Sequence, residues 1–163
     1  MKKPILFFIA IALLGITACK RKTTETFYFN CYINGQYFEP EKQQGLGEYP
    51  LTAKLINDDT QLRIDADRGI QNVFMGVRDS AKIKIQSYEL ANIPYRSQAI
   101  YDKSLGVDDY RADSTNPGII NITLLDKTNM IVAGAFYFDA YNAATKDTVH
   151  ITDGKFKLKY DLH

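Results

Sequence analysis

Residues 118–138 read GIINITLLDKTNMIVAGAFYF, two runs of alternating apolar and polar side chains separated by the turn segment 126–130. An alternation with a period of two is typical of a β-strand with one buried face. A three-residue loop at 127–129, with Asn129 in the left-handed conformation, predicts two cross-strand pairs: Leu124 with Val132 and Ile120 with Phe136. A shift of one residue would place phenylalanine in water. The stretch therefore predicts an antiparallel hairpin.

The C-terminal stretch 149–160, VHITDGKFKLKY, has the same alternation on both sides of Asp153-Gly154. Asp-Gly favours a type I′ turn because both central residues of that turn need positive φ. A two-residue turn at this dipeptide predicts three cross-strand pairs: Ile151 with Phe156, Val149 with Leu158 and, on the polar face, His150 with Lys157. We therefore expect a second hairpin with one dry and one wet face.

At the front of the domain, Asn34-Gly35 lies between two aromatic runs and predicts another type I′ hairpin. This turn places Cys31 opposite Phe38 and Tyr32 opposite Tyr37. Cys31 shares its face with apolar neighbours, which favours a buried cysteine that acts as a small hydrophobic residue over a reactive thiol.

The central part of the chain continues the strand pattern. Segments 51–55 and 62–66 alternate around the polar turn 57–60, and a more continuous apolar run follows at 70–77. The longest irregular stretch is 103–118. We expect a single domain over 27–163 with an all-β fold: a mostly antiparallel β-sandwich or flattened barrel of about nine strands. The inward residues fit a filled core and an apolar pocket equally well.

The first eighteen residues predict a cleaved lipoprotein signal peptide. Lys2 and Lys3 precede the apolar run 5–14, and small or aliphatic residues lead into Cys19. The apolar run is too short to span a membrane. We expect Cys19 to become the lipidated N-terminus, with 19–26 as a flexible tether. Loss of the two lysines changes the net charge from +1 to −1, which excludes an electrostatic footprint for nucleic acid.

Residues able to carry chemistry are few. The chain has only two histidines, His150 and His163, and no hydrolase, zinc or phosphate-loop motif. Asp65 and Asp67 lie two apart on a predicted strand and could act as paired carboxylates, but a solubilising face beside Arg63 is the favoured interpretation. The only metal candidates are calcium ligands in the long irregular stretch: Asp108, Asp109 and Asp113. We predict no cofactor and no catalytic residue.

Four segments together resemble the small Bacteroidetes envelope lipoproteins that carry a domain of unknown function: CYINGQYF at 31–38, GIINITLLD at 118–126, GAFYF at 134–138 and VHITDGKF at 149–156. The resemblance implies an extracytoplasmic β-domain and supplies no activity. Surface-exported lipoproteins of that phylum carry acidic residues just after the lipidated cysteine, whereas this chain has Lys20, Arg21 and Lys22. By that resemblance, we expect an outer-membrane anchor that faces the periplasm.

These observations favour a non-enzymatic binding or structural module of the cell envelope, anchored by lipid, with an unknown envelope protein or glycan as its partner. The alternative is a carrier that holds an apolar or glycan ligand on or within the β-body. A carrier predicts an apolar cavity of roughly 300 Å³ or more. An interaction module predicts a filled core and an exposed aromatic patch, for which the candidates are Tyr28, Tyr32 and Tyr37.

Overall fold

The computed structural model describes residues 26–42, 49–104, 106, 109–115 and 117–162. The predicted signal peptide, Cys19, all but the last residue of the tether, Asp108 and His163 lie outside these residues. Every regular element in the described ranges is a strand, and no helix there is long and apolar enough to cross a membrane.

The described chain forms twelve strands, which are, in order, β1 (Tyr28–Ile33), β2 (Gln36–Phe38), β3 (Leu51–Ile56), β4 (Gln61–Arg68), β5 (Gln71–Arg78), β6 (Ser87–Leu90), β7 (Ser97–Asp102), β8 (Asp109–Arg111), β9 (Gly118–Asp126), β10 (Ile131–Asn142), β11 (Asp147–Lys159) and β12 (Asp161–Leu162). The all-β, mostly antiparallel fold class is confirmed. The strands beyond the expected nine include segments of two or three residues, such as β8 and β12, which are too short to show a periodicity in sequence.

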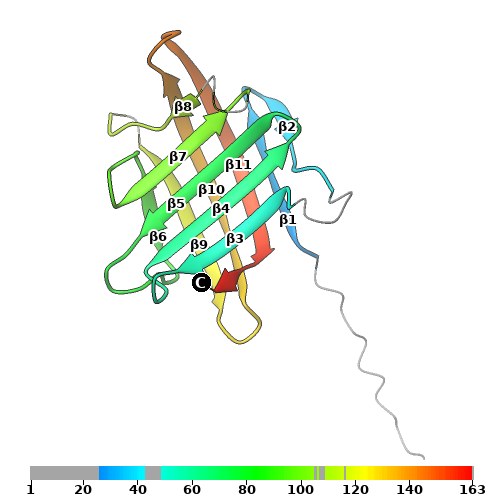
Figure 1. Ribbon diagram of the computed structural model, residues 1–163, viewed down its shortest axis with the longest axis vertical. Helices are drawn as coiled ribbons and strands as arrows, with labels where there is room; N and C mark the ends of the chain where they lie inside the picture. The colour runs from blue at the N-terminus through cyan, green and yellow to red at the C-terminus, as the bar shows by residue number, and fades with distance from the viewer. Residues whose placement is uncertain (1–25, 43–48, 105, 107–108, 116, 163) are drawn as a thin grey trace, which may run out of the picture.

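All twelve strands belong to one open sheet that folds over into two layers (Figure 1). Strands β3, β4, β5 and β7 form the front layer, and β6, β9, β10, β11, β1 and β2 form the back layer. Strand β8 pairs with both β7 and β10 and so joins the layers on one side. On the other side, β12 continues from β11 and pairs in parallel with β3.

The space between the layers is filled by side chains from both inner faces. Phe136 lies at its centre, with ring centroids 5.1 Å from Phe29, 6.3 Å from Phe156 and 6.5 Å from Phe138. Each of these rings is at most 3% exposed, and burying one contributes roughly 2 to 3 kcal/mol. No buried side-chain polar atom in the described residues lacks a hydrogen-bond partner. The interior is therefore a packed core.

Several predicted registers are confirmed. Cys31 pairs with Phe38 and Tyr32 with Tyr37 around Asn34-Gly35, whose φ values are 49° and 79°. Strands β3 and β4 form the expected hairpin around 57–60, and the apolar run at 70–77 forms strand β5. In each case the turn residues and the apolar alternation agree, so the short-range sequence pattern was sufficient to predict the strand pairing.

The first hairpin of the C-terminal third is only partly as predicted. Ile120 pairs with Phe136, but Leu124 pairs with Ala133 in place of Val132 and is exposed. The loop has four residues, 127–130, and its left-handed residue is Met130. Asp126 stabilises this longer loop by accepting hydrogen bonds from the backbone N–H groups of residues 128 and 129. A bulge at Thr123 absorbs the extra residue and restores the predicted register.

The predicted hairpin at Asp153-Gly154 is wrong. Residues 147–159 form one continuous strand, β11, which pairs with β10 on one side and β1 on the other. The dipeptide forms a bulge in both ladders, with Asp153 at φ 53°. A Cβ at Gly154 would lie 2.6 Å from the Phe136 ring, so glycine is needed for that ring to pack. The same local requirement for positive φ is met here inside a strand.

Candidate functional site

Cys31 occupies the position that the alternation predicts. Its side chain is fully buried between the layers and is a free thiol. Burial raises the pKa of this thiol to about 12. Because the thiolate is the nucleophilic form of cysteine, a thiol with so high a pKa is unreactive at neutral pH.

The calcium candidates are not brought together in the described residues. Asp109 pairs with Arg111 within β8, and the Asp113 carboxylate accepts a hydrogen bond from the backbone N–H of Thr115. No cluster of three metal-ligating side chains exists in the described ranges. The two described aspartates therefore support local structure.

Asp65 and Asp67 do lie side by side on the outer face of the front layer. The Asn72 side-chain amide donates to both carboxylates, at 2.8 Å to Asp67 and at shorter range to Asp65. Burial raises the pKa of Asp65, the neighbouring Asp67 charge raises it further, and the Asn72 hydrogen bond and Lys54 oppose the shift. The Asn72 amide therefore bridges the Asp65 and Asp67 carboxylates, and this geometry favours a structural role for both.

His150 is on the wet face as predicted, but it does not face Lys157. The correction follows from the continuous β11, in which His150 pairs with Asp139 of β10. Its Nδ1 lies 2.8 Å from Asp139 Oδ1, and both side chains are exposed.

The predicted tyrosines lie on the outer face of the back layer. We use the name tyrosine patch for Tyr32, Tyr37 and Tyr137, which are between 41% and 54% exposed. Tyr32 and Tyr37 meet edge to face with centroids 5.8 Å apart. Thr152 of β11 pairs with Tyr32, and Tyr137 of β10 lies opposite the β11 bulge, so the patch crosses four strands. Tyr28 is also exposed but lies at the other end of β1.

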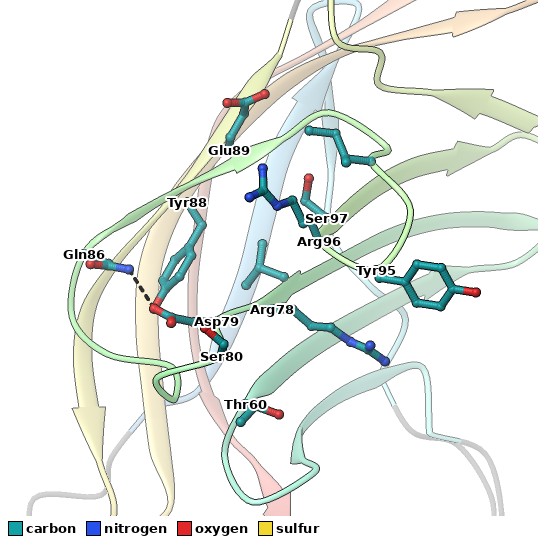
Figure 2. Close-up of a pocket in the computed structure, with 12 residues that line it drawn as sticks. Thr60, Arg78, Asp79, Ser80, Gln86, Tyr88, Glu89, Tyr95, Arg96 and Ser97 are labelled. Atoms are coloured by element: carbon teal, nitrogen blue, oxygen red, sulfur yellow. Dashed lines mark hydrogen bonds between the residues drawn. The ribbon is translucent and has the colours of Figure 1, made fainter.

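A surface hollow of about 670 Å³ lies where the β5–β6 connection meets the β6–β7 loop (Figure 2). The polar groups of its β5–β6 connection form hydrogen bonds with one another. The Asp79 carboxylate accepts hydrogen bonds from the Ala81 backbone N–H at 2.8 Å and from Gln86 at 3.1 Å, with the Tyr88 hydroxyl at 3.4 Å. Burial raises the pKa of Tyr88, which keeps its hydroxyl neutral. These contacts hold the 79–88 connection in place.

A second hollow of about 280 Å³ lies on the other side of the same loop. Gly76 is at its floor, where the Phe74 ring lies 3.3 Å from the position a Cβ would take, and its walls are formed by strands β4 and β5 and by the loop 93–96. We use the name arginine groove for this hollow and for the side chains on which its chemistry depends, namely Gln61, Arg63, Arg78 and Tyr95. No carboxylate is among the described residues that line it.

The arginine groove was not predicted from the sequence. Its side chains come from β4, β5 and the β6–β7 loop, and no spacing rule links such positions. The one local signal is Gly76, which interrupts an apolar strand, because a glycine inside a strand often marks a close approach or an opening.

The fold and these sites define a class of protein: a two-layer, mostly antiparallel β-domain with a packed interior and candidate binding sites on its outer surfaces. The chain belongs to the family described as Domain of unknown function (DUF6252), whose model matches residues 51–158, from the first residue of β3 almost to the end of β11. No curated protein and no solved structure matches the chain.

Proposed function

We propose that this protein is a non-enzymatic binding module of the bacterial cell envelope, anchored by lipid on Cys19 to the outer membrane and facing the periplasm. The charged and apolar segments that precede Cys19 support the anchor, and the basic tether supports the orientation. The likeness to Bacteroidetes envelope lipoproteins supports the same compartment.

The observation that carries the binding role is a packed core combined with the exposed tyrosine patch. A carrier of an internal ligand needs an apolar cavity, but here five phenylalanine rings fill the centre between the layers. Three half-exposed tyrosines on β10, β1 and β2 offer aromatic surface and hydroxyl groups on the outer face of the back layer. Tyrosine is enriched in binding surfaces for this combination of apolar area and polar tip. The partner is an envelope protein or glycan.

The anchor is tested by metabolic labelling with a palmitate analogue in the producing cells. We expect label on the native chain and its recovery in the membrane fraction, since each buried methylene contributes about 0.8 kcal/mol to membrane binding. Cys19→Ser should abolish the label, whereas the matched control Cys31→Ser should retain it because Cys31 is buried in the core. Label that persists in Cys19→Ser would overturn the anchor.

The binding face is tested by placing a photo-crosslinking amino acid at Tyr32 or Tyr137 in living cells. We expect a discrete crosslinked adduct from either position and none from Asp58, an exposed residue of the β3–β4 turn in the front layer. Adducts of equal yield from all three positions, or none from the tyrosine positions, would contradict a partner on the back layer.

A further inference from the structure

The arginine groove presents positive charge that the described residues do not neutralise. Arg78 donates from Nε and Nη2 to the side-chain oxygen of Gln61, at 3.2 and 3.0 Å. A neutral amide fixes the position of this guanidinium without cancelling its charge. Three of its five N–H donors remain for a ligand.

Arg96 also lines this hollow, but Figure 2 shows its guanidinium on the opposite side of the loop from the Arg78 guanidinium and the Tyr95 ring. Arg63 supplies the second cation of the groove. No hydrogen bond or ion pair of the Arg63 side chain is found among the described residues, and the side chain is exposed. The cross-strand neighbours of Arg63 are Lys54 and Gly76, so its nearest partner across β3 is another cation. Like charges placed directly opposite one another destabilise a sheet, and a bound anion would remove that cost.

The loop that forms one wall is held rigidly. The backbone N–H of Arg78 donates to the Arg96 carbonyl at 2.7 Å, and the N–H groups of Arg96 and Ser97 both donate to the Ile93 carbonyl. These bonds join the loop to β5, so the loop backbone that carries Tyr95 keeps a fixed position beside the strand that carries Arg78. Such preorganisation lowers the entropic cost of binding.

Tyr95, at the tip of this loop, has two unfavourable properties. Its side chain is 86% exposed, and its φ of 62° lies in the left-handed region that bulky side chains avoid. Figure 2 shows its ring directed outward, on the same side of the loop as the Arg78 guanidinium. A strained, exposed aromatic beside a cationic hollow indicates a binding function.

We propose that the arginine groove binds an acidic sugar: its carboxylate, sulfate or phosphate group pairs with Arg63 and Arg78, and its ring packs against Tyr95. Paired guanidinium N–H groups match the geometry of an oxyanion. A tyrosine ring offers an apolar face to the C–H groups of a sugar. The hollow of about 280 Å³ suits one or two sugar units. The site lies on the opposite layer from the tyrosine patch and does not depend on it.

The test is an NMR titration of the full-length protein in detergent with three probes: glucuronate, glucose and inorganic phosphate. We expect glucuronate to shift the backbone amides of Gly76, Tyr95 and Arg96, with weaker binding at higher salt. Glucose should bind at least tenfold more weakly, because it lacks the charge. Absence of glucuronate binding would overturn the site, and phosphate bound as tightly as glucuronate would overturn the role of the sugar.

Variants separate ligand contacts from folding. Arg63→Gln and Arg78→Gln should each weaken glucuronate binding about tenfold or more, since each removes a charged hydrogen bond. Tyr95→Gly relieves the positive φ, so it should weaken binding without lowering thermal stability. The control Lys159→Gln, on the back layer, should leave binding unchanged. Equal affinity in the arginine variants and this control would refute the proposal, whatever the crosslinking at Tyr32 shows.

Discussion

Asp65 shows that a charged residue on the outer face of a sheet can still destabilise the folded state. Its carboxylate shares the Asn72 amide with Asp67, and burial is the largest cause of its raised pKa. A raised pKa means that the folded state holds the proton more tightly than the unfolded chain does. The stabilising contribution is therefore present below the ordinary pKa of 3.8 and is lost as pH rises through the higher folded value.

Replacement of the Asp65 carboxylate by an amide tests whether its negative charge destabilises the folded state. Asp65→Asn keeps an oxygen that can accept from Asn72 but removes the charge, so we expect the thermal midpoint to rise by a few degrees at pH 7. The gain should shrink toward zero at pH 3, where the native carboxyl is protonated. Thermal unfolding followed by circular dichroism at pH 7 and pH 3 measures this gain in thermal midpoint, with Glu89→Gln as an exposed control. A larger gain at pH 3 than at pH 7 would contradict the assignment.

At the scale of elements, the bulge in β11 adds one residue without moving any side chain to the wrong face. Ile151, Gly154, Phe156 and Leu158 are all buried, and only the addition of Asp153 interrupts the regular alternation. The shift in register falls at this point in both the β1 and the β10 ladders. The bulge therefore absorbs a residue locally, as the Thr123 bulge does in β9.

Two single-residue deletions test this interpretation. Deletion of Asp153 makes both ladders regular and keeps every inward side chain inward, so we expect a folded protein with a free energy of unfolding lower by about 1 to 2 kcal/mol. Deletion of Lys157 leaves Leu158 and Tyr160 on the wrong face, and we expect no folded product. Urea unfolding compares the two. Equal damage from both deletions would show that the bulge itself is required.

At the scale of the whole molecule, the two layers protect each other's inner faces. Cys31 lies in β1 with no exposed surface, covered by side chains from both layers. Strands β8 and β12 close the two sides of the sandwich. A reagent can reach the thiol only when the layers separate, and that separation exposes most of the core at once.

Thiol labelling of Cys31 should therefore report global unfolding. In a Cys19→Ser background at pH 8, we expect labelling to be slow, because the thiol is both inaccessible and, with a pKa of about 12, protonated. The opening free energy from labelling rates should agree with that from urea unfolding to within about 1 kcal/mol. An unfolded control in urea gives the intrinsic rate. Rapid labelling in native buffer would show that β1 opens independently of the core.

The sequence alone determined the fold class, the dry and wet faces of most strands and the register of the N-terminal hairpin. These properties depend on alternation with a period of two and on turn residues a few positions apart, so they are readable locally. The buried state of Cys31 and the exposed state of Tyr32 and Tyr37 follow from the same pattern.

Only the tertiary structure decided how Asp153-Gly154 is used and where the arginine groove lies. A positive φ at Asp153 is compatible with either a turn or a bulge. The bulge forms because β1 and β10 pair with β11 on both sides and keep it continuous. The groove joins Arg63 and Arg78 from two strands with Tyr95 from a loop. Such a site depends on strand order and loop placement, which long-range packing determines and local pattern does not encode.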